Sequence, residues 1–271
     1  RSDETFYFEE DAQGVMGIGA EPAESTWHLT INGKGNSWMP FGSTHTLLGA
    51  APALIHPEPK TAFLIGLGSG DTAWAMAHRE TFTTITCYEL SPRQRPLLER
   101  FHSTTNFPDL GQMLSDQRIR HVIGDGRRAL DRSNEKYDLI EADALHPYSA
   151  YSGNVYSVEF FELCKSRLAP GGLMCSWTPR PAIRAAFAQV FPHVLVFDQE
   201  EVCIGAEFPL TVDIPAWLVK LERAYRRGYF SERVGIMLGA HLTGGRVLDR
   251  TRLSSVLPNR DLEPRDEFRM R

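Results

Sequence analysis

The chain has few of the features that mark metal, disulfide-bonded or membrane-spanning proteins. Its 271 residues include four cysteines, with no CxxC pair and no Cys/His spacing typical of zinc ligands. No run of about 18 apolar residues occurs, and no secretory signal opens the chain. We therefore expect no metal, no membrane contact and a reducing, cytoplasmic location. The first residue is Arg1 rather than Met, which leaves open whether a further segment, membrane-bound or not, precedes it.

Positive charge is also scarce. The formal net charge is −5, whereas general nucleic-acid binders carry a basic excess, so we expect no nucleic-acid partner. Arginines do gather near the C-terminus, where we interpret them as a solvated face. The composition, 42% hydrophobic and 23% charged, is typical of a globular protein with a substantial core.

The hydrophobic pattern predicts an α/β protein in three parts. Residues 1–45 show short antiparallel β segments, and Asn32-Gly33 is a strong hairpin signal because both residues tolerate a positive φ. Residues 46–210 alternate strands and helices with short connections, which is typical of a doubly wound, Rossmann-like sheet. Residues 211–271 are expected to form a C-terminal helical extension, in which a helix at 217–227 is followed by loops.

Short apolar runs predict the strands of this sheet, and amphipathic runs predict its helices. The expected strands span 62–65, 84–88, 119–123, 137–141, 173–177, 194–197 and 202–207. The expected helices span 44–55, 71–78, 93–101, 127–132, 158–168 and 183–190. Trp38 and Trp74 are interpreted as core residues.

A glycine-rich turn lies where the first of these strands passes into a helix. Gly66, Gly68 and Gly70 permit a tight turn and a close approach of the backbone to a ligand, and the helix start adds unsatisfied N–H groups. By itself the loop is also explained as a structural turn. The third glycine of a dinucleotide fingerprint is missing, because position 71 is Asp, and hydride transfer is therefore disfavoured.

Acidic residues follow the next two strands. Glu89 ends the second strand, where a carboxylate accepts hydrogen bonds from ribose hydroxyls. Asp125, followed by Gly126, comes after the third strand, at the place of an adenine amino group. Each acid alone is equally an N-cap or a solvated side chain. Because the carboxyl ends of adjacent parallel strands share one edge of the sheet, the acids and the glycine turn together predict a nucleoside cofactor of the S-adenosylmethionine type.

Several motifs follow one another along the chain. They are the Gly66–Gly70 loop, Glu89, Gly124–Arg127, Tyr137–Ile140, Asp143, Tyr156–Phe161 and Leu168–Gly172. In this order they resemble the spermidine synthase (aminopropyltransferase) family, over roughly residues 5–205. The resemblance implies a class I methyltransferase fold with a β-rich N-terminal module. It also implies a homodimer, and a transferase of polyamine biosynthesis that alkylates an amine with S-adenosylmethionine or its decarboxylated form.

The resemblance further implies roles for individual residues. Asp143, after the fourth strand, occupies the position of the base that deprotonates the acceptor amine; the alternative is an N-cap or a surface acid. His45 lies in the substrate-binding segment, although a lone histidine there is also explained as locally satisfied. His146, Tyr148 and Tyr151 lie in the loop expected to cover the acceptor, with an ordinary surface loop as the alternative.

Three positions depart from the family pattern. Ser69, His146 and Thr46 stand where the family has acids that hold the cationic groups of the donor and of a polyamine. Each lost charge-assisted contact costs about 1.5–3 kcal/mol. Ser69 is still expected to contact the cofactor. Two other functions therefore stay open: a small-molecule methyltransferase that uses intact S-adenosylmethionine, and a catalytically degenerate, synthase-like binding domain.

Overall fold

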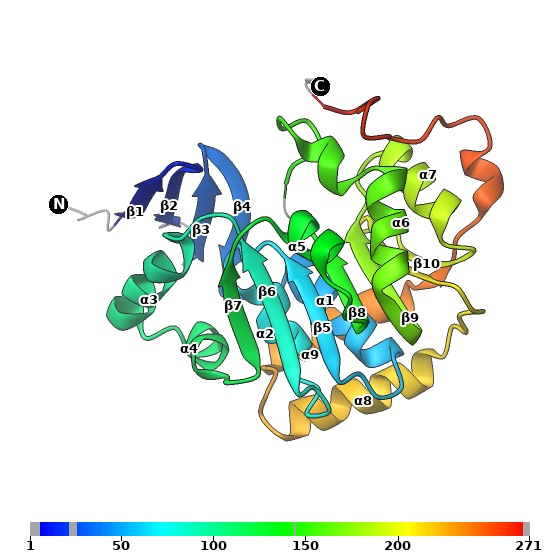
Figure 1. Cartoon of the computed structure of the whole chain (residues 1–271). Coiled ribbons are helices and arrows are strands. Elements are labelled where there is room, and N and C mark those ends of the chain that lie inside the picture. Colours follow the sequence, from blue (N-terminus) through cyan, green and yellow to red (C-terminus); the bar gives the residue numbers. More distant parts are fainter. Residues whose placement is uncertain (1–5, 22–25, 144, 268–271) are drawn as a thin grey trace.

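The computed structural model describes residues 6–21, 26–143 and 145–267, which form two sheets and the helices around them (Figure 1). The smaller sheet is an antiparallel meander of β1 (Phe6–Asp11), β2 (Gly14–Glu21), β3 (Thr26–Ile31) and β4 (Lys34–Met39). Asn32 and Gly33 join β3 to β4 with φ values of 51° and 73°, which confirms the predicted hairpin. Residues 1–5 and 22–25 of the predicted β region lie outside the described residues.

The larger sheet has the strand order β12-β10-β11-β9-β8-β5-β6-β7. Its parallel part consists of β5 (Thr61–Ile65), β6 (Thr84–Glu89), β7 (Ile119–Ile123), β8 (Tyr137–Ala142) and β9 (Leu168–Trp177). Its antiparallel edge consists of β10 (His193–Phe197), β11 (Val202–Ala206) and β12 (Arg246–Val247). The chain runs outward from β5 through β6 to β7 and then returns to the other side of β5. The carboxyl ends of β5 and β8 therefore border the switch point where open α/β sheets bind ligands.

Helices cover both faces of this sheet, which confirms the α/β fold. One face, with Leu64 and Leu139, packs against α1 (Thr44–Ile55), α2 (Asp71–Met76), α8 (Ile214–Arg226) and α9 (Glu232–Thr243). The opposite face, with Phe63 and Ile140, packs against α5 (Gly126–Arg132), α6 (Val158–Arg167) and α7 (Pro181–Val190). The two sets alternate along each strand, as expected for a sheet buried on both sides.

The remaining helices connect the two sheets and close the C-terminal segment. They are α3 (Gln94–Thr105), α4 (Pro108–Ser115) and the short 3-10 helices η1 (Ser152–Val155) and η2 (Arg250–Leu253). Phe101 of α3 packs edge-on against Tyr7 and Trp27 of the small sheet, at ring-centroid distances of 5.4 and 5.1 Å. This aromatic cluster fixes the small sheet beside the large one. Among the helices described, none combines the length and the apolar character that a membrane span requires.

The structure differs from the sequence prediction at the C-terminus, where α9 replaces an expected loop. Val234, Leu238 and Leu242 are buried at helical spacing, and the Ser231 hydroxyl accepts a hydrogen bond from the Val234 N–H. Glycines within the segment lower its intrinsic helix propensity by about 1 kcal/mol each, which explains the wrong prediction. Burial of the apolar stripe against the sheet compensates for that cost.

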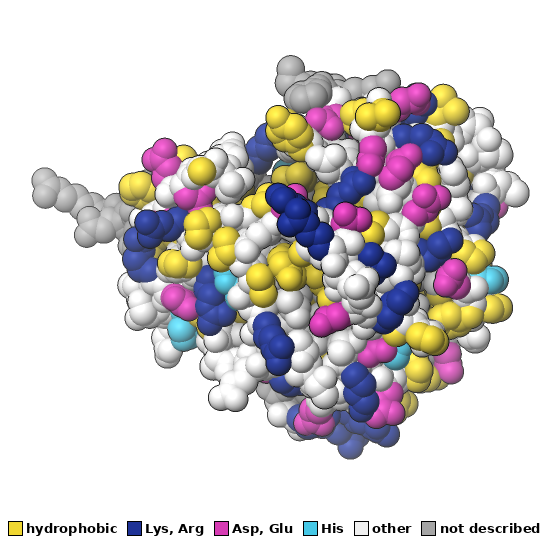
Figure 2. Space-filling model, in the orientation of Figure 1, with side chains coloured by type: hydrophobic (Ala, Val, Ile, Leu, Met, Phe, Trp, Pro, Cys, Tyr) yellow, Lys and Arg dark blue, Asp and Glu magenta, His cyan; other side chains and the backbone are white. Residues whose placement is uncertain are grey.

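Two smaller differences concern α4, which was not predicted, and β9, which begins at Leu168 rather than at 173. The Trp38 prediction was also wrong. Its side chain is 41% exposed, because Ser37 and Met39 on either side point to the core and a strand alternates its side chains. Trp74, in contrast, is fully buried as predicted. On the face shown in Figure 2, basic and acidic side chains are interspersed and form no patch of one sign.

Candidate functional site

The predicted cofactor residues meet at one edge of the large sheet. The glycine turn follows β5, Glu89 ends β6, Asp125 follows β7 and Asp143 follows β8. These strands are neighbours and parallel, so their carboxyl ends share that edge. Fold and residue order thus place a glycine turn and three acids around the switch point of the sheet.

The glycine turn has a backbone that only glycine adopts freely. Gly66, Gly68 and Gly70 have φ values of 100°, 52° and 89°. A Cβ atom on Gly70 would also lie 2.3 Å from the Met113 side chain. Ser69 within the turn is buried, and its hydroxyl has no hydrogen-bond partner among the described residues. A buried hydroxyl without a partner is costly and suits a ligand that supplies the missing bond.

Glu89 is held by the backbone of two neighbouring segments. Its two carboxylate oxygens accept hydrogen bonds from the N–H groups of Leu67 and Ser91, each at 2.9 Å. Burial raises the pKa of Glu89, while these N–H groups oppose that shift. Since a carboxylate has about four acceptor positions, further hydrogen bonds from ribose hydroxyls are compatible with this arrangement.

Asp125 is the N-cap of α5. Its Oδ1 atom accepts a hydrogen bond from the Arg128 N–H at 3.1 Å, so the N-cap interpretation is correct, and an additional contact with adenine stays a prediction. Gly126 opens the helix, and a Cβ atom there would lie 2.8 Å from Cγ1 of Ile65. A side chain at this position would therefore disturb the end of β5, next to the glycine turn.

A cavity of about 210 Å³ lies beside this edge, and Asp143 and His45 both line it. Nε2 of His45, at the start of α1, is 3.2 Å from Oδ2 of Asp143. The two side chains are 21% and 12% exposed, so the pair is sheltered and still reachable from the cavity. An imidazole in contact with a carboxylate forms a pair that holds or releases a proton near neutral pH.

The surroundings of His45 favour its protonated form. Burial lowers the pKa of His45, but the hydrogen bond and charge of Asp143, together with the charges of Asp71 and Glu200, raise it above its ordinary value. Asp71 lies behind the cavity, where its Oδ1 atom accepts a hydrogen bond from the Thr46 hydroxyl at 2.6 Å. Burial raises the pKa of Asp71 to about 6. Thr46, which replaces an acid of the family pattern, thus links α1 to the helix of the glycine turn.

Of the three predicted substrate residues in the loop after β8, only one lines the cavity. His146 lines the cavity, its Nε2 atom lies 2.7 Å from the Gly35 carbonyl oxygen, and its ring stacks on Tyr148. Tyr148 is itself 36% exposed. Tyr151 is 73% exposed, does not line the cavity, and its backbone N–H donates to Glu267. The structure therefore unites His45, Asp143 and His146, with Tyr148 supporting the third, and leaves Tyr151 outside.

Sequence reasoning missed several cavity-lining residues. They come from β4, the start of α1 and the end of β9: Asn36, Trp38, Ser43, Thr44 and Trp177. Asn36 also faces the glycine turn, since a Cβ atom on Gly68 would lie 3.1 Å from its Oδ1 atom. No motif marks these positions. Asn36 and Trp38 reach the cavity through the docking of the small sheet, and Ser43, Thr44 and Trp177 reach it through the packing of α1 beside β9.

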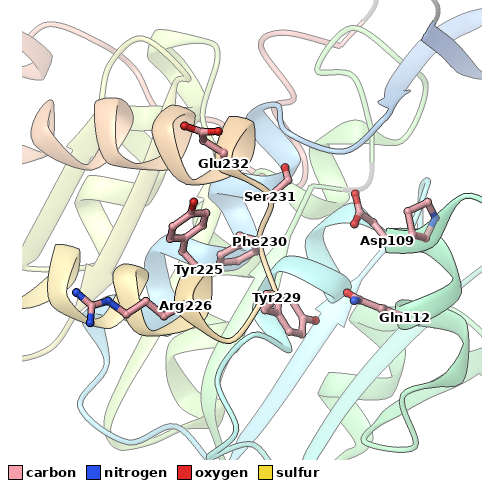
Figure 3. A pocket seen from close by; sticks show the side chains of 10 residues that line it. Asp109, Gln112, Tyr225, Arg226, Tyr229, Phe230, Ser231 and Glu232 are labelled. Carbon is pink, nitrogen blue, oxygen red and sulfur yellow. The ribbon is translucent and has the colours of Figure 1, made fainter.

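A second hollow, of about 530 Å³, lies between α4 and the connection from α8 to α9. Figure 3 shows Asp109 and Gln112 of α4 facing Tyr229 and Phe230 across it. Gln112 accepts a hydrogen bond from the Trp74 indole, and the Tyr229 hydroxyl donates to the Trp74 carbonyl. These polar groups tie the helices together, and none of the predicted site residues lines this hollow. Within the described residues, no three His, Cys, Asp or Glu side chains gather as metal ligands.

The fold is a Rossmann-like, methyltransferase-like α/β fold with a small antiparallel β module at its N-terminal end. The model of the spermine/spermidine synthase domain matches residues 42–192, and the chain belongs to this family.

Curated relatives share a limited part of the chain. A polyamine aminopropyltransferase of Buchnera aphidicola subsp. Acyrthosiphon pisum is 28% identical over 130 residues, which are 48% of this chain and 43% of the relative. A polyamine aminopropyltransferase of Thermoplasma volcanium is 29% identical over 138 residues, 51% of this chain and 48% of the relative. The chain thus spans less than half the length of these relatives.

Solved structures agree in fold over a larger part. A spermidine synthase in complex with the transition state analogue AdoDATO has a TM-score of 0.66 and 17% identity, covering 86% of this chain and 84% of its own. A spermidine synthase from Thermotoga maritima has a TM-score of 0.63 and 17% identity, covering 86% and 87%. The likeness includes both the large sheet and the small antiparallel one.

Proposed function

We propose that the protein is a transferase that alkylates an amine, using S-adenosylmethionine or its decarboxylated form as the alkyl donor. The observation that carries the proposal is the His45–Asp143 pair, which lies in a cavity at the end of β8, beside the glycine turn after β5. The names of the relatives, polyamine aminopropyltransferases, support an aminopropyl group as the group transferred. The boundaries proposed for the catalytic part are residues 46–210, with the small sheet completing the cavity.

Several groups of the chain suit an adenosyl sulfonium compound. Glu89 would accept hydrogen bonds from the ribose, Asp125 and the backbone after β7 would lie at the adenine, and the glycine turn would admit the sulfonium side. Ser69, whose buried hydroxyl has no partner among the described residues, would meet the amino-acid-derived tail. When bound, this donor supplies an electrophilic carbon next to a sulfur that leaves as a neutral thioether.

Asp143 and His45 would prepare the acceptor nitrogen. An amine enters as its ammonium ion, which the Asp143 carboxylate attracts and orients. One N–H proton then passes to the Asp143–His45 pair, where the imidazole is the better proton acceptor, because its pKa is raised above the ordinary value. The freed lone pair forms the new C–N bond while the C–S bond breaks and its electron pair stays on sulfur. The charges balance, since one sulfonium charge is lost as one imidazolium forms.

The test is product identification with each donor and a panel of amines. Release of methylthioadenosine reports transfer of a propyl-type group, and release of S-adenosylhomocysteine reports methyl transfer. We expect amine-dependent methylthioadenosine. Formation of S-adenosylhomocysteine alone would show a methyltransferase. If calorimetry detects binding of neither donor and none of methylthioadenosine, both enzymatic functions are contradicted.

A further inference from the structure

The charges that line the cavity are few. Among the described residues that form its wall, Asp143 is the one carboxylate, and it is already in contact with the His45 imidazole. The wall therefore contributes at most one net negative charge, and none when His45 is protonated. With neutral His45, this charge balances one ammonium ion, whereas a second ammonium ion would be buried without a counter-charge, which is costly.

The two other acids that act on His45 do not belong to the wall. Asp71 is bound to the Thr46 hydroxyl behind α1. Glu200, in the turn from β10 to β11, accepts a hydrogen bond from the Thr44 hydroxyl and lies 3.4 Å from Nε2 of His241. Both carboxylates therefore favour the imidazolium form of His45, and neither lines the cavity where an acceptor would lie.

The rest of the wall combines the uncharged polar side chains of Asn36, Ser43 and Thr44 with aromatic and apolar ones. Trp38, Trp177, Leu145 and His146 line it. Trp38 is stacked on His28 with a centroid distance of 4.0 Å and an interplanar angle of 5°, so one of its faces is already covered. His146 is held by the Gly35 carbonyl and stacks on the ring of Tyr148. Fixed rings of this kind favour a flat or apolar body over a hydrated chain end.

From these features we infer that the acceptor is a small monoamine with an apolar or aromatic body, rather than a linear diamine. This inference rests on the proposed function, since it assigns the acceptor of the same cavity. Its ammonium lies at Asp143, and its body lies between Trp177, Trp38 and His146. The cavity volume of about 210 Å³ restricts the acceptor to small molecules, because drug-sized ligands occupy roughly 300–1,000 Å³.

Binding of matched amines tests the inference without requiring turnover. Calorimetry on the full chain saturated with methylthioadenosine would compare butylamine, phenethylamine and the diamine putrescine. Butylamine and putrescine have the same carbon chain and differ in the second ammonium. We expect both monoamines to bind at least about tenfold more tightly than putrescine, which corresponds to about 1.4 kcal/mol. Equal or tighter binding of putrescine, or no binding of any amine, would overturn the inference.

A pair of variants at one position sharpens the test. His146→Asp restores an acid at the position where the family pattern has one, and we expect the ratio of putrescine to butylamine affinity to rise at least about tenfold. His146→Asn introduces a side chain that is similar in size to Asp but neutral, and is expected to leave this ratio near that of the unmodified protein. An unchanged ratio in His146→Asp would contradict the charge argument. If the monoamines bind as expected and neither donor yields a thioether nucleoside product, the proposed transfer fails while the inferred binding preference stands.

Discussion

Nε2 of His45 and Oδ2 of Asp143 lie 3.2 Å apart although they come from different parts of the fold, the start of α1 and the end of β8. The cavity wall brings the two groups together at the sheet edge that also contains the glycine turn. The proton that the His45 imidazole holds or releases therefore lies in the cavity proposed to bind the acceptor. Both the reaction and the stability of the protein should therefore depend on the protonation of His45.

Asp143→Asn tests the acceptor base. The amide keeps the shape of the carboxylate but neither attracts an ammonium ion nor takes its proton. We expect amine-dependent release of the thioether nucleoside to fall by about 10²–10⁴. Donor affinity, measured by calorimetry, should change far less, because the groups proposed to bind the donor follow β5, β6 and β7. A fall in donor affinity as large as the fall in rate would assign Asp143 to the cofactor site instead.

The rate should rise with pH through the raised pKa of His45, because only the neutral imidazole accepts a proton from the amine. His45→Gln should remove this limb of the kcat/KM profile and lower the plateau. A profile of the same shape in the variant would exclude His45 as the titrating group. Alkyl ammonium groups such as that of Lys have an ordinary pKa of about 10, so the acceptor amine titrates at a higher pH than His45. Measurements from pH 5 to pH 9 therefore separate the titration of His45 from that of the amine.

The free energy of unfolding should fall with rising pH, whereas the rate should rise. His45 has a higher pKa in the folded protein than the ordinary value of about 6.5 in the unfolded chain. Its pairing with Asp143 therefore contributes fully below about pH 6.5, and the contribution is lost as the pH rises through the folded pKa. Urea unfolding of the protein and of Asp143→Asn, compared from pH 5 to pH 9, should show a difference that shrinks with rising pH. A constant difference would mean that the pair does not titrate in this range.

Ser69 is predicted to determine how the donor tail is tolerated. A buried hydroxyl without a charge does not repel the carboxylate of intact S-adenosylmethionine, so calorimetry should find the two donors within about tenfold of each other, or 1.4 kcal/mol. Ser69→Asp should favour the decarboxylated donor by more than that, and Ser69→Ala serves as the uncharged control. A strong preference for the decarboxylated form in the unmodified protein would show that another group recognises the tail.

The C-terminal segment pins the loop that follows Asp143. Arg127 of α5 donates to both carboxylate oxygens of Asp261, and the Ser157 hydroxyl donates to the same carboxylate at 2.5 Å. Glu267 accepts a hydrogen bond from the Tyr151 N–H at 2.6 Å, and the segment runs beside this loop in Figure 1. Asp261→Asn should lower the free energy of unfolding by about 1–2 kcal/mol in urea and raise KM for the acceptor more than it lowers kcat. Glu263→Gln, whose carboxylate pairs with Arg265 within the segment, is the matched control.

How much of this site is predictable from the sequence follows from how local each feature is. The glycine turn and the acids at strand ends were found because a strand, a turn and a helix start are encoded within a few residues. Trp38 and Trp177 were not assigned to the cavity, since which face of a strand lines it depends on how the two sheets dock. The pairing of His45 with Asp143 is likewise set by the packing of α1 on the sheet, which no local pattern reports.

Glu141 is the clearest feature that the sequence did not reveal. It lies in β8, in register with Leu64 and Cys175 on the neighbouring strands, and its side chain is 1% exposed. Its Oε1 atom has no hydrogen-bond partner among the described residues. Burial, together with the nearby charge of Asp143, raises the pKa of Glu141 well above its ordinary value. Glu141 is the last residue but one of β8, and an acid at this place gives no periodic signal that would separate a buried side chain from an exposed strand end.

Replacing this acid should stabilise the protein. Glu141→Leu removes a buried polar group without a partner, and we expect the free energy of unfolding at pH 8 to rise by about 1–3 kcal/mol. The sign with pH follows from the raised pKa: the unfolded chain ionises Glu141 from about pH 4.3, while the folded protein keeps it protonated to a higher pH. The free energy of unfolding of the unmodified protein therefore falls as the pH rises above that value. The difference in free energy of unfolding between Glu141→Leu and the unmodified protein should grow between pH 4 and pH 8 in urea unfolding. Glu141→Gln, neutral at every pH but still polar, should show the same pH trend with a smaller gain, and a difference that does not vary with pH would mean that Glu141 is not held protonated in the folded state.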